Sequence, residues 1–242
     1  MPVWAASVML AWATLYFSDE IEMNNGSFDI NKNHRLYFDD AYHAMPLLSG
    51  SLPMVENYLE ALHKVIDCAL DDHGRVFAFR VDLRFPDSLA CDEVVASSAV
   101  VSRFMESLKA KIKHNREIAK KNGGLVHDTR VRYFWVREIG DQGKVHYHFV
   151  VLLNGHAYNW LGDFRSANGN MANRIWEAWA SALGISVEDA KPLAHFPENP
   201  SYMLRRDDPE SVAVFFQRAS YLCKARTKQY GSGHHGYGAS RG

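Results

Sequence analysis

Residues 145–153 read V-H-Y-H-F-V-V-L-L, an apolar run that holds two histidines one residue apart. Alternate residues of a β-strand point to the same face, so this spacing directs the His146 and His148 imidazoles toward one small volume. Imidazole nitrogens are common ligands of divalent metal ions. The stretch therefore predicts a β-strand that carries half of a metal site. The alternative is that both histidines are ordinary polar side chains on a strand face.

A second strand is predicted directly before this one, over residues 130–139. The connecting residues 140–143, G-D-Q-G, are typical of a hairpin turn. A turn centred on Gln142 places Glu138 opposite His146, and its carboxylate then shares a face with both imidazoles. A slip of one residue would move Glu138 to the other face, so this prediction depends on the register.

Two imidazoles and one carboxylate leave open coordination positions on a divalent ion. This mixed set of nitrogen and oxygen ligands suits Mn²⁺ or, in a cell rich in magnesium, Mg²⁺, and Zn²⁺ is a further candidate. The cofactor predicted from these residues is therefore a divalent metal ion held by Glu138, His146 and His148.

The surrounding elements predict an α+β domain. Residues 75–85 alternate between large apolar side chains and alanine or charged ones, as in a strand with one buried face. Apolar side chains at helical spacing predict a helix over 52–70, and an amphipathic pattern that ends at Asn-Gly-Gly predicts one over 92–121. A segment rich in Trp and Ala predicts a helix over 171–183, and an Asp-Pro-Glu start signal predicts one over 208–224. This order favours a central antiparallel sheet with helices on one face and the active site on the other.

Changes in composition suggest the domain boundaries. The segment 49–51 is S-G-S, so we expect an N-terminal extension over 1–50 and the folded domain over 51–230. Residues 231–242 are rich in Gly, Ser and His and are predicted to be a flexible tail. Residues 3–17 are apolar but short for a bilayer span, and no Lys or Arg precedes them. We therefore expect a buried or interfacial helix there, with a signal or membrane anchor as the alternative, and no membrane partner.

The overall charge does not indicate a nucleic-acid-binding protein. The chain has 27 Lys and Arg against 28 Asp and Glu, a formal net charge of −1. A nucleic acid would therefore need a local basic surface. The three cysteines, Cys68, Cys91 and Cys223, are widely spaced and form no zinc or disulfide pattern, which favours a reducing cytoplasm.

A tyrosine follows the histidines by about seventy residues. Tyr221 and Lys224 lie three positions apart in a predicted helix and so share one face. A free phenol has a pKa of about 10 and is a weak nucleophile at neutral pH unless a cation or a polarised phosphate assists it. Lys224 would supply that positive charge. Tyr-x-x-Lys also occurs often by chance, and a core tyrosine is the alternative.

Local basic residues do occur along the chain. Arg80 and Arg84 lie on the polar face of the 75–85 strand, where phosphate oxygens could reach them, and Arg132 joins them from the hairpin. Arg226 and Lys228 follow the tyrosine. A further group late in the 92–121 helix is explained by the helix dipole and by solvation, with DNA contact as the alternative. That group comprises Lys109, Lys111, Lys113, Arg116, Lys120 and Lys121.

Together these segments resemble a known pattern. Residues 132–154, with their H-Y-H core, resemble the histidine motif of the HUH endonucleases, whose sheet is of the RRM-like kind. Residues 219–228, A-S-Y-L-C-K-A-R-T-K, resemble the tyrosine motif of the same family. Residues 80–86, R-V-D-L-R-F-P, resemble the first strand of filamentous-phage replication initiators and related prophage proteins of the YagK/YfjJ type.

The resemblance implies an enzyme that nicks single-stranded origin DNA to start rolling-circle replication of a phage, plasmid or integrated element. It makes Tyr221 the nucleophile that leaves a 5′-phosphotyrosine, Lys224 the accompanying lysine, and His146 and His148 metal ligands. Host helicase and polymerase would be possible partners. A mobilisation relaxase or transposase with the same chemistry, and a non-cleaving DNA-binding regulator on the same scaffold, are the alternatives.

Overall fold

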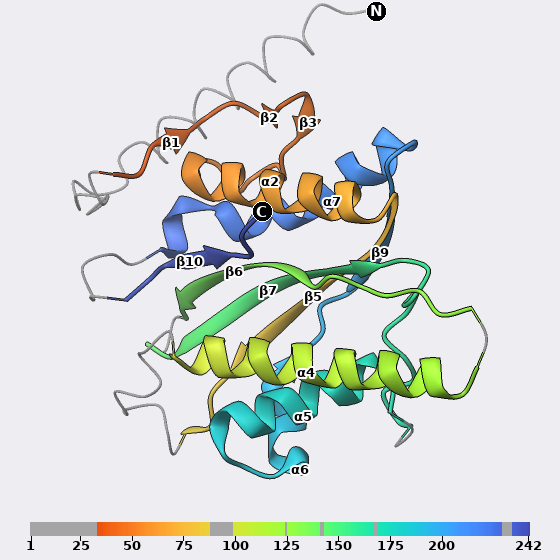
Figure 1. Ribbon diagram of the computed structural model, residues 1–242. Coiled ribbons are helices and arrows are strands. Elements are labelled where there is room, and N and C mark those ends of the chain that lie inside the picture. The colour runs from red at the N-terminus through yellow and green to blue at the C-terminus, as the bar shows by residue number, and fades with distance from the viewer. Residues whose placement is uncertain (1–32, 88–98, 124, 141–142, 167–168, 229–233) are drawn as a thin grey trace, which may run out of the picture. The chain divides into compact units, whose positions relative to one another are not determined.

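Strand β7 (Val145–Asn154), which contains both histidines, lies at the centre of an antiparallel sheet in the computed structural model of the protein (Figure 1). The structure describes residues 33–87, 99–123, 125–140, 143–166, 169–228 and 234–242. Three predictions therefore fall outside the described residues: the helix over 3–17, the start of the 92–121 helix and the centre of the hairpin turn.

The sheet confirms the predicted hairpin and the predicted strand before it. In the order β10-β6-β7-β5-β8, each strand pairs with its neighbours in the antiparallel sense, and β9 also pairs with β5. The bounds are β5 (Arg75–Arg84), β6 (Arg132–Ile139), β8 (Ala194–His195), β9 (Ser201–Arg205) and β10 (Tyr237–Ala239). Two small pairs lie outside it, β1 (Leu36–Tyr37) with β4 (Met54–Val55) and β2 (Ala41–Tyr42) with β3 (Met45–Pro46).

The helices are α2 (Glu56–Asp72), α4 (Ala99–Lys121), α5 (Met171–Leu183), α6 (Val187–Ala190) and α7 (Pro209–Ser220), with 3₁₀ turns η2 (Lys191–Leu193), η3 (Tyr221–Cys223) and η4 (Ala225–Thr227). The four predicted helices are present, with α5 at its predicted limits and with the start of α2 and the end of α7 each displaced by four residues; the short helix α6 was not predicted. The start signal of α7 is confirmed, because the Asp208 side chain accepts a hydrogen bond from the Ser211 N–H and proline follows it. Among the described residues, no helix has the length and apolar character needed to cross a bilayer.

Alternation along the strands divides the core between the two faces of the sheet. On one face, Phe149 and the other outward apolar side chains of β5 and β7 pack against Phe104 of α4 and Trp179 of α5. This layer and the antiparallel sheet confirm the α+β prediction, with α4 and α5 on one face (Figure 1). His146 and His148 lie on the other face, because they alternate along β7 with Tyr147 and Phe149 of this layer. Helices α2 and α7 cover the rest of the face that carries the histidines, around Val76 and Leu152 (Figure 1).

The folded unit begins earlier than the sequence suggested. It starts at His34, so residues 34–50 belong to the domain and not to an extension. Leu47 is buried, and the Leu48 N–H donates to Ser220 Oγ at 3.1 Å. The S-G-S segment that set the predicted boundary is a turn inside the domain, because local composition does not reveal such long-range contacts.

The predicted flexible tail is also different in the structure. Residues 237–239 form β10, an edge strand that pairs with β6 through Gly238 opposite Trp135. A Cβ on Gly238 would lie 2.7 Å from the Trp135 ring, so glycine permits this close approach. The Tyr237 ring packs against Tyr58 of α2 at 4.2 Å between centroids. In this segment, a composition rich in Gly and Ser therefore accompanies close packing instead of flexibility.

Deletion of residues 234–242 is expected to lower the free energy of unfolding by about 1–3 kcal/mol, because backbone groups of β6 lose their partners and Tyr58 is uncovered. Urea denaturation of the deleted and full chains would measure the difference. Deletion of Gly242 alone is the matched control and should leave stability unchanged. Equal stability of all three chains would restore the interpretation as a flexible tail.

Candidate metal centre

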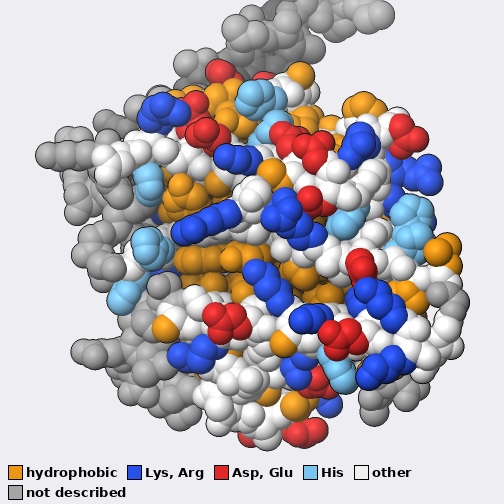
Figure 2. Space-filling model, viewed as in Figure 1, with side chains coloured by type: hydrophobic (Ala, Val, Ile, Leu, Met, Phe, Trp, Pro, Cys, Tyr) orange, Lys and Arg blue, Asp and Glu red, His pale blue; other side chains and the backbone are white. Residues whose placement is uncertain are grey.

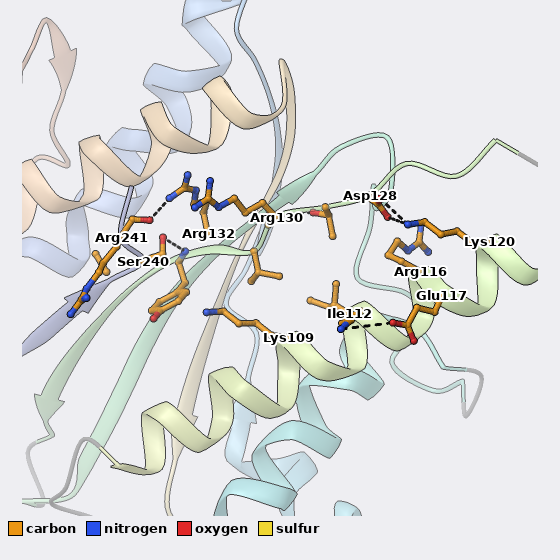
Figure 3. Close-up of a pocket in the computed structure, with 15 residues that line it drawn as sticks. Lys109, Ile112, Arg116, Glu117, Lys120, Asp128, Arg130, Arg132, Ser240 and Arg241 are labelled. Carbon is orange, nitrogen blue, oxygen red and sulfur yellow. Dashed lines mark hydrogen bonds and ion pairs between the residues drawn. The ribbon is translucent and has the colours of Figure 1, made fainter.

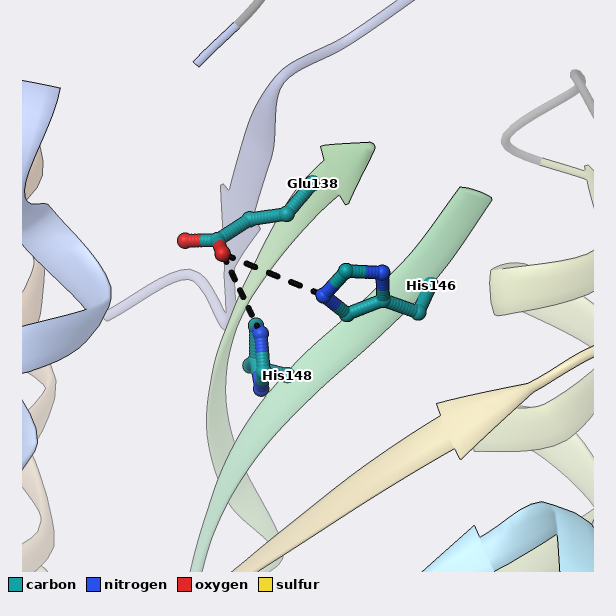
Figure 4. Close-up of side chains that lie close together, drawn as sticks. All are labelled: Glu138, His146 and His148. Carbon is teal, nitrogen blue, oxygen red and sulfur yellow. Dashed lines mark ion pairs between the residues drawn. The ribbon is translucent and has the colours of Figure 1, made fainter. Parts of the chain in front are cut away.

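Pairing between β6 and β7 brings the three predicted ligands together. Glu138 lies opposite His146 and Val136 lies opposite His148, so the predicted hairpin register is confirmed. All three side chains point to the same side of the ribbon (Figure 4). One ligand atom from each lies within 4.8 Å of the others. Glu138 and His148 are buried and His146 is half-buried, and the group could hold a metal ion.

The Glu138 Oε2 atom is the point on which both imidazoles converge. It lies 3.3 Å from His148 Nε2 and 3.9 Å from His146 Nε2 (Figure 4). The His148 Nε2 atom is buried and makes no hydrogen bond within the described residues. A buried ring nitrogen that faces a carboxylate oxygen is satisfied by a cation placed between them. The residues therefore fit a divalent metal ion with two nitrogen ligands and one oxygen ligand.

Asp82 on β5 fixes the orientation of His148, a role that the sequence did not reveal. Asp82 lies directly opposite His148 on the neighbouring strand, and its Oδ1 is 2.5 Å from His148 Nδ1. Such a contact turns the other ring nitrogen toward Glu138. Burial, the largest single effect, would lower the pKa of His148, but the hydrogen bond to Asp82 and the nearby Glu138 carboxylate together outweigh it and the pKa is raised. The pKa of His146 is lowered, mainly by burial and to a smaller extent by the neighbouring His148.

Asp82→Asn is expected to weaken Mn²⁺ binding by about 10–100-fold, because the amide is a poorer partner for the His148 ring and no longer fixes it. Isothermal titration calorimetry would measure the affinity. Asp87→Asn is the matched control, since Asp87 lines the same cavity but pairs with Lys144 instead of an imidazole. Equal affinities for the two variants would contradict an orienting role for Asp82.

Two buried lysines hold the Glu138 carboxylate. Lys228 Nζ lies 2.5 Å from Oε1 and Lys224 Nζ lies 3.5 Å from Oε2. Burial opposes ionisation of Glu138, but His148 and Lys228 outweigh it and keep the pKa of the carboxyl well below its usual range. The prediction that Lys228 contacts DNA is therefore wrong, because its ammonium points inward from the end of η4 and is enclosed with Glu138.

Tyr221 lies against the same lysine. Lys224 Nζ is 3.5 Å from the centroid of the Tyr221 ring, and the Arg80 guanidinium carbon is 6.0 Å from it. The predicted helix ends at Ser220 and Tyr221 begins η3, but residues three apart also align in a 3₁₀ turn. The Lys224 ammonium therefore connects the Tyr221 ring with the Glu138 carboxylate, and the structure groups the tyrosine and histidine segments in one cluster.

A cavity of about 560 Å³ opens beside the two histidines. Arg84 is exposed and lines it, so this arginine lies where it was predicted, on the open side of the metal group. Arg80 is buried instead, and stands beside Tyr221. Arg226 is exposed on η4.

Arg132 is not part of this cluster. It begins β6, and six residues separate it from Glu138, which corresponds to about 20 Å along a strand. Its Nε donates to Asp72 Oδ2 at 2.7 Å, at the end of α2. The prediction that Arg132 joins Arg80 and Arg84 is therefore wrong. Arg132 lies opposite Leu152 of β7, whereas Arg84 lies opposite His146, at the other end of that strand. The Arg132 side chain is engaged by Asp72 instead of standing with Arg80.

Most of the chain matches known proteins. Residues 38–240 match the family model described as YagK/YfjJ C-terminal domain. YfjJ of Escherichia coli (strain K12) is 35% identical over 198 residues, which cover 78% of this chain and 95% of the relative. YagK of the same strain is 31% identical over 193 residues, 76% of this chain and 92% of the relative. No solved structure gives a significant match. The chain belongs to the YagK/YfjJ C-terminal domain family.

Proposed function

We propose that this protein is a metal-dependent, site-specific single-strand DNA endonuclease and strand transferase of the HUH type. It would nick an origin in the cytoplasm, start rolling-circle replication of a phage, plasmid or integrated element, and leave a 3′ end for the host replication proteins. One observation carries the proposal. Lys224 contacts both the Tyr221 ring and the same Glu138 oxygen on which His146 and His148 converge.

This cluster contains the groups that phosphotyrosine chemistry needs. The Tyr221 oxygen attacks the scissile phosphorus and loses its proton, while the bond from phosphorus to O3′ breaks and the leaving oxygen takes up a proton. The products are a 5′-phosphotyrosine and a free 3′-OH, which can later reverse the step. Lys224 places positive charge beside the ring and the incoming phosphate. A divalent ion bound by the Glu138 group would neutralise charge on that phosphate and orient it for in-line attack.

The geometry around the histidines supports a single strand as the substrate. Arg84 and Lys144 provide positive charge at the wall of the 560 Å³ cavity. Asp87 offsets Lys144 through an ion pair of 2.7 Å. Helices α2 and α7 cover the other end of this face, so DNA would enter beside the hairpin. A melted or single-stranded segment fits such an entrance better than a duplex.

The test is the formation of a covalent protein–DNA adduct. Overlapping single-stranded oligonucleotides that tile the DNA around the gene would be incubated with the protein and Mn²⁺ and separated on a denaturing gel. We expect one strand to give an adduct that EDTA prevents, and a second oligonucleotide with a free 3′-OH to take over the bound strand. DNA binding with no adduct on any strand would contradict the proposal and favour the non-cleaving regulator.

A further inference from the structure

A second and larger cavity, about 920 Å³, lies between α4 and the edge formed by β6 and β10 (Figure 3). Cations from three separate parts of the chain line it, and we call it the α4 groove. They are Lys109, Lys113, Arg116 and Lys120 of α4, Arg130 and Arg132 at the start of β6, and Arg241 after β10. Glu117 and Asp128 are the two carboxylates among its lining residues. The groove is therefore strongly basic in a chain whose formal charge is −1.

Carboxylates neutralise only part of this charge. Lys120 pairs with Asp128 at 2.8 Å, whereas Lys113 and Glu117 are 4.0 Å apart and both exposed. Asp72, which lies outside the groove, forms ion pairs with both Arg130 and Arg132. Three carboxylates thus face seven cations, and the surplus positive charge lies along α4 and at Arg241.

Uncharged partners hold two of the remaining cations in place. The Lys109 ammonium stands 4.9 Å from the centroid of the Tyr133 ring. The Arg116 guanidinium stands 4.5 Å from that of Tyr158 and donates to Asn115 Oδ1. Such contacts orient a cation without cancelling its charge. Both side chains are therefore ordered in advance for an anionic ligand.

The shape and the floor of the groove indicate which anion it fits. From Lys109 to Lys120 it follows α4 for about 17 Å. Its floor includes Ile112, Val131 and Ala239, and Figure 2 shows Lys and Arg side chains on both sides of a hydrophobic band across this face. A groove with an apolar floor and a basic rim matches a single nucleic-acid strand, whose bases are flat and apolar and whose phosphates are anionic.

We propose that the α4 groove binds the sugar–phosphate backbone of single-stranded DNA at a second contact, separate from the metal centre. This inference rests on the proposed function, because it takes the same DNA as ligand. The α4 groove and the metal centre lie on opposite faces of the sheet, and Arg132 and Glu138 are about 20 Å apart along β6, so one strand would have to pass around the β10 edge to contact both sites. The groove supplies affinity that does not depend on base sequence, and the cavity beside the histidines receives the scissile phosphate.

The test compares two variants with the same change of charge. Lys109→Glu/Lys113→Glu alters the groove, and Lys64→Glu/Lys121→Glu alters exposed lysines of α2 and α4 outside it. Fluorescence anisotropy with a labelled single strand of mixed sequence, about forty nucleotides long, would measure affinity at several salt concentrations. We expect at least about 10-fold weaker binding for the groove variant, with a salt slope shallower by about 1.4 for two lost phosphate contacts. The control variant should stay within about twofold of the unsubstituted protein.

The outcomes separate this inference from the proposed function. If the two variants bind equally and the unsubstituted protein forms the adduct, the α4 groove is not a DNA-binding site and the proposed nicking reaction is retained. If only the groove variant loses binding and the unsubstituted protein forms no adduct on any strand, DNA binding by the α4 groove is retained and the nicking reaction is overturned. An unsubstituted protein that neither binds the labelled strand nor forms an adduct on any strand would overturn both. Circular dichroism spectra of all chains would verify that the exposed substitutions preserve the fold.

Discussion

Tyr221→Phe is expected to lower the rate of covalent DNA-adduct formation by at least about 1,000-fold, because the substitution removes the atom that attacks phosphorus. Phenylalanine keeps the ring that lies against Lys224 and near Arg80, so the surrounding cluster is preserved. The adduct would be quantified on a denaturing gel with the oligonucleotide that the unsubstituted protein cleaves. Mn²⁺ affinity, measured by calorimetry on the same preparation, should not change, since the phenol is not one of the three predicted ligands.

Two further variants make this result specific to the nucleophile. Tyr230→Phe removes the next tyrosine along the chain and should retain full adduct formation. His146→Ala should lose both adduct formation and Mn²⁺ binding, which distinguishes a missing metal ligand from a missing nucleophile. An adduct that survives Tyr221→Phe and disappears in Tyr230→Phe would assign the attacking oxygen to Tyr230 and contradict the mechanism proposed above.

The features that the sequence predicted correctly depend on neighbours that are close along the chain. The hairpin register followed from a four-residue turn, and it placed Glu138 with His146 and His148. The α5 helix over 171–183 followed from a local run rich in Trp and Ala, and its limits are those predicted. Alternation along a strand and periodicity along a helix are local properties, so a single sequence contains them.

The features that were missed or wrongly predicted depend on which distant segments lie side by side. Asp82 orients His148 only because β5 pairs with β7 in one particular register. Residues 237–239 form an edge strand because they pair with β6. Their composition alone does not indicate that pairing. Lys228 was assigned to a surface because a lysine is usually exposed, and the buried Glu138 that binds it is ninety residues away. Pairing across such distances requires the fold itself.

The buried pair of Glu138 and Lys228 is expected to affect stability strongly even without metal or DNA. Both side chains are almost fully enclosed, at 3% and 1% exposed, and Lys224 is enclosed with them at 4%. Glu138→Gln keeps the shape of the side chain but leaves two buried ammonium groups without their anion. Loss of one partner of a buried ion pair typically lowers the free energy of unfolding by about 3–5 kcal/mol. We expect a decrease in that range, measured by urea denaturation in EDTA.

The double variant Glu138→Gln/Lys228→Met decides whether this decrease comes from the unpaired charge. Methionine fills a volume similar to that of the lysine stem and carries no charge, so the ammonium that lost its closest partner is removed. The double variant should therefore recover at least about 1 kcal/mol relative to Glu138→Gln, although Lys228→Met alone is destabilising. Lys64→Met, on the exposed surface of α2, is the control for the substitution itself and should not rescue Glu138→Gln. If the single effects of Glu138→Gln and Lys228→Met simply add, the two charges are not coupled. The carboxylate would then be held by its histidine and Lys224 contacts, and its pairing with Lys228 would not stabilise the fold.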